Sequence, residues 1–226
     1  MIGIIYDDAY LEHKPPRSHI ENPGRVLAII RSVGDYVAME RPINNIDEWL
    51  LRVHDANYVK QIDEACSMGY VFIDADTYVS PGTCKAARHA VGAVLRGGID
   101  KVLSGEWNAA YAIVRPPGGH HVGHGGRALM APTQGFCIFN NVAIGAVYAI
   151  EHGISRVAIL DVDAHHGNGT QEIFYKDPKV LYISLHQDPL TIYPGTGFID
   201  DVGEGEGEGF NVNVPPLPPF TADDAT

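Results

Sequence analysis

Cysteine is scarce in this sequence. Its 226 residues include three, Cys66, Cys84 and Cys137, and no two of them form a CxxC pair. This spacing predicts no disulfide framework, which is typical of a protein in a reducing, cytoplasmic location. Basic residues are also few: 16 lysines and arginines stand against 28 acidic residues, giving a net charge of −12. An acidic surface repels phosphate backbones, so we expect no direct binding to nucleic acid.

Long apolar runs are absent as well. No run of about eighteen apolar residues occurs, so we expect no membrane span. The N-terminal sequence MIGIIYDDAY lacks the basic segment of a secretory signal. The composition is instead that of a globular protein, with 45% hydrophobic and 19% charged residues. In the absence of a clear linker, we predict one domain over residues 1–226.

Short apolar runs alternate with segments of helical periodicity along the chain. They predict strands at 2–6, 108–114, 157–162 and 179–185, and helices at 23–37, 49–68, 83–103 and 140–152. This alternation favours an α/β fold in which helices cover both faces of a parallel sheet. The run GEGEGEG at 203–209 is typical of a solvated turn. Ligands in such folds bind in the loops that follow the carboxyl ends of the strands.

One predicted strand end carries Asp161, Asp163 and His165. Residues two apart in a strand point the same way, so these side chains face one side as the chain leaves the sheet. Carboxylate and imidazole groups are suitable zinc ligands. The alternative is a set of capping and salt-bridge residues, which the cost of an unpaired buried carboxylate disfavours. Arginase-type hydrolases place a second-metal aspartate where this chain has Gly167, which favours a single metal.

The pair His120-His121 lies in a loop rich in proline and glycine, after another strand. Adjacent imidazoles near a metal are suited to general acid and base chemistry. Asp161 and Asn168 are the available partners for fixing their tautomers. A carboxylate partner makes one histidine more basic than the other, which has an amide partner. The alternative is a glycine loop with exposed histidines, as we expect for His124.

Two aromatic residues are candidates for the wall of a narrow channel. Phe136 follows Gly135 in the sequence GFCIFNN, and Tyr193 begins the turn YPGTG. Core packing is nearly as compatible with both residues, so the pattern alone leaves this choice open.

At these positions the sequence resembles the histone deacetylase and acetylpolyamine amidohydrolase superfamily, in its prokaryotic, class II-like branch. The matching stretches cover almost the whole chain in the family's order: HIENPGR at 19–25, RPPGGHH at 115–121, GFCIFNN at 135–141, DVDAHHGNGT at 161–170, SLH at 184–186, YPGTG at 193–197 and NVNVP at 211–215. The resemblance implies an arginase/deacetylase-type three-layer α/β fold with a mainly parallel sheet. It also implies a Zn²⁺-dependent hydrolase that removes acetyl or other acyl groups from lysine side chains or polyamines.

The resemblance assigns roles to individual residues. Asp163 and His165 would be zinc ligands. His121 would be the general base and acid, oriented by Asn168, and His120 its electrostatic partner, bonded to Asp161. The substrate-binding residues would be Gly135, Phe136, Tyr193 and Asp76, the last at the rim. One site for K⁺ or Na⁺ would use Asp161, Asp163, His165, Ser184 and Leu185, and a second would use Phe174, Asp177, Val180 and Phe210.

The chain also departs from the family pattern. Family domains are longer and supply, beyond the NVNVP segment, an aspartate as third zinc ligand and a tyrosine or histidine that polarises the acyl carbonyl. This chain ends at Thr226 before either is matched, so we expect a C-terminally truncated domain. The alternatives are a non-catalytic fragment that acts as a binding module and an arginase-like ureohydrolase. An oligomer is compatible with the resemblance, because polyamine-type relatives form dimers.

Overall fold

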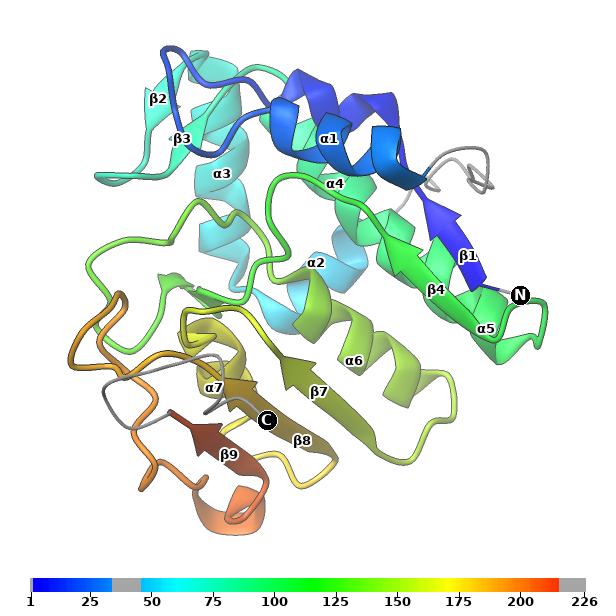
Figure 1. The fold of residues 1–226 in the computed structure, drawn as a ribbon, viewed down its shortest axis with the longest axis vertical. Coiled ribbons are helices and arrows are strands. Elements are labelled where there is room, and N and C mark those ends of the chain that lie inside the picture. The colour runs from blue at the N-terminus through cyan, green and yellow to red at the C-terminus, as the bar shows by residue number, and fades with distance from the viewer. Residues whose placement is uncertain (1, 34–45, 216–226) are drawn as a thin grey trace.

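The computed structural model describes residues 2–33 and 46–215. Two parallel sheets organise the chain (Figure 1). In the first, β1 (Ile2–Ile5) pairs with β4 (Ala109–Ala112). In the second, the order is β7 (Val157–Asp161), β8 (Val180–Leu185) and β9 (Asn211–Val214). The predicted α/β class with a mainly parallel sheet is confirmed.

Helices and short hairpins fill the connections. The helices are α1 (Gly24–Val33), α2 (Asp47–Val53), α3 (Ala56–Met68), α4 (Thr83–Gly92), α5 (Asp100–Leu103), α6 (Asn141–Glu151) and α7 (Asn168–Phe174), with 3₁₀ turns at Asp8–Glu12 and Gly205–Gly207. The hairpins are β2 (Val71–Phe72) with β3 (Tyr78–Val79) and β5 (Val122–Gly123) with β6 (Gly126–Arg127). A π-helical segment, Ala93–Ile99, joins α4 to α5, so the helix predicted at 83–103 is continuous. The sequence did not predict α7 or β9, and residues 34–37 of the first predicted helix lie outside the described residues.

The single helix predicted at 49–68 is wrong, because the chain makes two helices there. His54 ends α2 with an extended backbone, at φ −103° and ψ 146°, and α3 begins at Ala56. The ring of His54 is hydrogen-bonded to the backbone of Gly123 and Asn140, outside both helices. A tertiary contact therefore overrides a helical periodicity that runs through the break.

The main core lies between the helices and one face of the second sheet. Ile144 from α6 and Phe174 from α7 pack with Ile159, Val180 and Tyr182 from the strands. Figure 1 shows α6 between the β1–β4 pair and β7. On the opposite face of the second sheet the side chains are exposed, with Leu160 at 61% and Val162 at 70%. Within residues 2–33 and 46–215, helices cover only one face of this sheet.

The prediction of no disulfide is wrong. Cys66, near the end of α3, is bonded to Cys84, near the start of α4. The β2–β3 hairpin between them folds back and brings the two helix ends together. Cys137 is a free, buried thiol. Among the described residues, no helix has both the length and the apolarity needed to span a membrane.

Candidate active site

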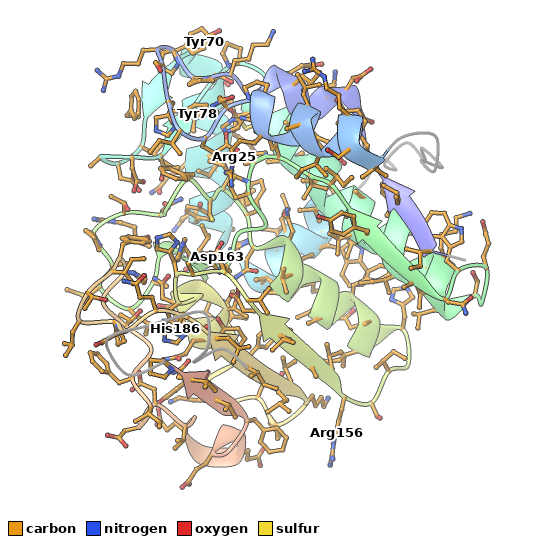
Figure 2. All side chains as sticks on the ribbon, in the orientation of Figure 1. Arg25, Tyr70, Tyr78, Arg156, Asp163 and His186 are labelled. Atoms are coloured by element: carbon orange, nitrogen blue, oxygen red, sulfur yellow. A yellow bond between two sulfur atoms is a disulfide. The ribbon has the colours of Figure 1, made fainter. Side chains whose placement is uncertain are left out.

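The predicted site residues gather beyond the carboxyl ends of the strands. Figure 2 labels Asp163 and His186, which follow β7 and β8 on the same side of the molecule. The loop after β4 brings His120 and His121 to this place from the other sheet. The buried Arg115 holds the start of that loop, because its guanidinium bonds Glu21 and the carbonyl of Tyr10. The edge at which the strands end thus carries the polar groups.

Each of the paired histidines has one fixed partner. His120 Nδ1 donates to Asp161 Oδ2 at 2.7 Å, and His121 Nδ1 donates to Asn168 Oδ1 at 2.8 Å. The direction of the second bond follows from Asn168, whose Nδ2 donates to the carbonyl of Ala128 at 2.8 Å and so turns Oδ1 towards His121. In both rings Nδ1 therefore carries a proton. In neutral His121 this leaves Nε2 with a free lone pair, as a general base requires.

The two partners move the histidine pKa values in opposite directions. Burial, together with the charge of the neighbouring His120, lowers the pKa of His121 to about 3. Burial also opposes the charged form of His120, but the hydrogen bond and charge of Asp161 outweigh it and raise the pKa. Burial opposes the charged form of Asp161 as well, but the hydrogen bond and charge of His120, together with the bonds from Asp163 and Tyr182, outweigh it and lower the pKa of Asp161. The rings, with centroids 4.0 Å apart, therefore differ in basicity in the direction that the sequence predicted.

Asp161 is the centre of a packed group. Its Oδ2 also accepts the hydroxyl of Tyr182 at 3.1 Å, and its Oδ1 accepts the backbone N–H of Asp163 at 3.1 Å. A Cβ at position 167 would lie 2.3 Å from the Tyr182 hydroxyl and 2.5 Å from Asp161 Oδ2. Position 167, where arginase-type hydrolases have the second-metal aspartate, therefore has no room for a side chain in this chain.

Asp163 and His165 converge at the open side of the site. Asp163 Oδ1 accepts the backbone N–H of His165 at 2.8 Å and lies 3.0 Å from its Nδ1. Two ligands of a tetrahedral zinc ion, each about 2.0–2.1 Å from the metal, lie about 3.3 Å apart. The donor types and spacing therefore fit two positions of a zinc ion. Both side chains are accessible, Asp163 being 50% and His165 40% exposed.

The described residues do not complete a metal site. They contain no cluster of three or more histidine, cysteine, aspartate or glutamate side chains able to hold a metal. A catalytic zinc ion usually has three protein ligands. A cleft of about 460 Å³, lined by His120, Asp161 and Asp163 together with apolar residues such as Val142 and Leu160, opens this side of the site towards β7.

The two predicted wall residues approach the histidines differently. The Tyr193 ring meets His121 edge-on with centroids 4.9 Å apart, and His165 at 5.9 Å. Phe136 meets His19 edge-on at 5.1 Å. The backbone around Phe136 is unusual, since Gly135 has φ +54° and Phe136 has φ +71°. A Cβ on Gly135 would lie 2.4 Å from the His121 ring, so this glycine lets the wall approach the histidine closely.

Asp76 is partly buried and is hydrogen-bonded to two threonines. Its Oδ1 accepts the hydroxyl of Thr77 at 2.8 Å, and its Oδ2 accepts the hydroxyl of Thr133 at 2.7 Å. Burial raises its pKa, although both threonine bonds oppose this effect. The bond from Thr133 could not be predicted from the sequence, because Thr133 lies 57 positions from Asp76.

The residues proposed for monovalent cations fall into two places. Asp161 and Ser184 are paired across β7 and β8, next to Leu185 and the metal-ligand candidates. The hydroxyl of Ser184 is bonded to His186 Nδ1 at 2.8 Å. The second set lies where α7 leads into β8: the N–H of Asp177 bonds the carbonyl of Phe174, and Phe210 bonds β8 through Tyr182. The structure brings each set together.

Comparison with known proteins agrees with this geometry. Residues 19–226 match the model of the histone deacetylase domain. The chain is 39% identical over 229 residues to a "Probable deacetylase" of Archaeoglobus fulgidus, covering 98% of this chain and 60% of that protein. It is 44% identical over 173 residues to a "Histone deacetylase-like amidohydrolase" of Pseudomonas aeruginosa, covering 76% of this chain and 43% of that protein.

A solved structure has the same fold. The crystal structure of the HDA15 HD domain superposes with a TM-score of 0.86 at 35% identity, covering 95% of this chain and 63% of that one. The chain spans about 60% of the length of its archaeal relative. The match to the family model, together with these identities, shows that the chain belongs to the histone deacetylase family.

Proposed function

We propose that this chain carries the proton-transfer part of a zinc-dependent active site that hydrolyses acyl-lysine or acyl-polyamine amides. The observation that carries the proposal is the orientation of His121. Its Nδ1 is tied to Asn168 at 2.8 Å, its ring lies 4.0 Å from His120, and its centroid is 6.0 Å from that of His165. A base with a free Nε2 is thus held beside two candidate metal ligands.

His121 would accept a proton from the attacking water. A lowered pKa keeps its imidazole neutral near pH 7, and Asn168 keeps Nε2 available. The imidazolium formed would then give its proton to the leaving amine nitrogen. A zinc ion held by Asp163 and His165 would supply Lewis-acid chemistry, activating water and polarising the acyl carbonyl.

His120 contributes charge rather than a second base. Its bond to Asp161 raises its pKa, so it favours the protonated form. A cation beside the reacting carbon stabilises the negative charge that develops on the amide oxygen. The same cation lowers the pKa of His121. His121 is therefore positively charged only after it has accepted the proton from water. The pair therefore divides the work between electrostatics and proton transfer.

The proposed reaction also needs a third zinc ligand and a residue that polarises the acyl carbonyl. The family resemblance places a third zinc ligand and a carbonyl-polarising residue beyond Pro215, and Asp223 and Asp224 lie outside the described residues. Loss of one oxyanion donor lowers the rate of other hydrolases by about 10²–10³-fold. The competing function is a binding module that has the fold but does not turn over substrate.

Zinc content and turnover together test the proposal. The purified chain would be dialysed against a mild chelator, its zinc measured by mass spectrometry, and acetyl-lysine peptide and acetylpolyamine tested as substrates. One zinc per chain and measurable turnover are expected, with turnover lost in His121→Ala while zinc is retained. The exposed His152, at the end of α6, offers a control in His152→Ala.

The other outcomes have distinct meanings. Turnover unchanged in His121→Ala would contradict the role given to that residue. Zinc retained without turnover, combined with binding of the acetylated peptide, would support the binding module. Absence of both zinc and turnover would refute the hydrolase proposal for this chain. Two metals per chain would instead point to arginase-like chemistry, which the space around Gly167 disfavours.

A further inference from the structure

The hydroxyl group of Tyr193 does not face the histidines. It donates to the carbonyl of Thr133 at 2.8 Å, while the edge-on ring remains 4.9 Å from His121. The wall therefore presents an apolar ring to anything bound beside His121. The polar part of the side chain crosses to the segment that carries the other wall, residues 133–136.

That segment is held on its other side by the β2–β3 turn, residues 73–77. Asp76 Oδ2 accepts the Thr133 hydroxyl at 2.7 Å, and Thr77 Oγ1 accepts the backbone N–H of Phe136 at 3.2 Å. Asp74 Oδ2 accepts the backbone N–H of Gln134 at 2.8 Å. These bonds stabilise a stretch in which a residue with a side chain has positive φ, a conformation that costs about 1–3 kcal/mol.

We propose that Asp76, Thr133 and Tyr193 form a bridge that fixes the position of the Tyr193 ring beside His121, relative to the segment that carries Phe136, and thereby selects short acyl groups. The three residues come from three separate loops, so the bridge sets their distance directly. Both carboxylate oxygens of Asp76 accept threonine hydroxyls, so the bridge gives Asp76 a positioning role that acts on the substrate through Thr133. The acyl selectivity rests on the proposed function, whereas the bridge itself does not.

The substrate class follows from the geometry. An acyl chain next to His121 must lie along the ring of Tyr193, because that ring covers both His121 and His165. By holding the ring in place, the bridge would favour an acetyl group over a longer, flexible acyl chain. Loss of the bridge lets the walls move apart, so the site becomes more tolerant of butyryl groups.

Hydrogen–deuterium exchange tests the bridge without any need for catalysis. Amide exchange of peptides covering 133–137 would be compared in the wild type, Tyr193→Phe, Thr133→Val and Asp76→Ala. We expect roughly three- to tenfold faster exchange in each, the effect of one lost hydrogen bond. We expect no further acceleration in the double variant of Thr133 and Tyr193, since residues in one network are not additive. Unchanged exchange, or additive effects, would overturn the bridge.

Peptide affinity tests the selectivity. The dissociation constants of acetyl-lysine and butyryl-lysine peptides, measured by fluorescence anisotropy with added zinc, should favour acetyl in the wild type. Tyr193→Phe and Thr133→Val should reduce that preference by roughly three- to tenfold. Tyr111→Phe, at an exposed tyrosine of β4, is the matched control and should leave the preference unchanged.

Three results would overturn the selectivity. An equal weakening for both peptides in Asp76→Ala, without an effect of Thr133→Val, would mean that Asp76 contacts the substrate directly. An unchanged preference in Tyr193→Phe would mean that the wall spacing does not select the acyl group. Failure of the wild type to bind either peptide would refute the selectivity and count against the proposed function, and the exchange result would still decide whether the bridge exists.

Discussion

Acid should destabilise this protein through His54, a residue outside the active site. The side chain is 3% exposed and has two partners of opposite kind. Its Nε2 accepts the backbone N–H of Asn140 at 3.0 Å, so its Nδ1 carries the proton and donates to the carbonyl of Gly123 at 2.9 Å. Protonation would place a second ring N–H against the N–H of Asn140, at the start of α6. The fold therefore accepts only the neutral ring.

The size of the effect follows from the pKa. Burial lowers the pKa of His54 from 6.5 to about 4, and the bond to Gly123 only partly opposes this. Because the folded-state pKa lies below the unfolded value, the unfolded chain binds the proton first as the pH falls. Stability present above pH 6.5 is therefore lost as the pH approaches 4. At about 1.4 kcal/mol per pH unit, the full shift corresponds to about 3 kcal/mol, of which about 2 kcal/mol is lost by pH 5.

Urea denaturation of the wild type and His54→Gln at pH 7.5 and pH 5 measures this contribution. The variant should lose less stability than the wild type on acidification, by about 2 kcal/mol. Comparing the two proteins cancels the contributions of other buried histidines. His152→Gln, at an exposed histidine, should keep the wild-type difference. If His54→Gln loses as much stability between the two pH values as the wild type, the reasoning from its two hydrogen bonds is wrong.

Three further predictions concern stability and the site. Glu21→Gln should lower the free energy of unfolding by about 3–5 kcal/mol, because it leaves the charge of Arg115 buried without its partner, and chemical denaturation at pH 7 checks this. Reduction of the α3–α4 disulfide should lower stability by about 3 kcal/mol, by the entropy of the loop it closes, seen as a lower urea midpoint with dithiothreitol. Gly135→Ala should displace the His121 ring and lower peptide turnover more than tenfold with the thermal midpoint lowered by only a few degrees, and unaltered turnover would show that the wall accommodates a methyl group.

Much of the fold was accessible from the sequence because it depends on local periodicity. Apolar runs located β1, β4, β7 and β8, and their alternation with helices predicted a parallel sheet. The elements α7 and β9 were missed, since α7 has only seven residues and β9 alternates asparagine with valine instead of forming an apolar run. The break at His54 was missed because nothing in the periodicity of 49–68 marks it.

The candidate site was predicted in part for a similar reason. Residues that follow strand ends meet at one edge of a parallel sheet, so His120, His121 and Asp163 were identifiable from their place in the chain. Asp161 and Asn168 were named as available partners, but the pattern alone did not assign each to its histidine, because His121 and Asn168 are 47 positions apart. The hydrogen bond from the Tyr182 hydroxyl to Asp161 could not be predicted, since a tyrosine within an apolar run is usually packed in the core.

The sequence by itself determined the α/β class, the edge at which the chemistry gathers and the residue types present there, because each depends on local order along the chain. Only the tertiary structure decided the Cys66–Cys84 bond, the tautomer of His121 and the internal use of Asp76. Each of these depends on which distant segments meet. The packing of the whole chain determines which segments meet, and the spacing of neighbouring residues does not predict it.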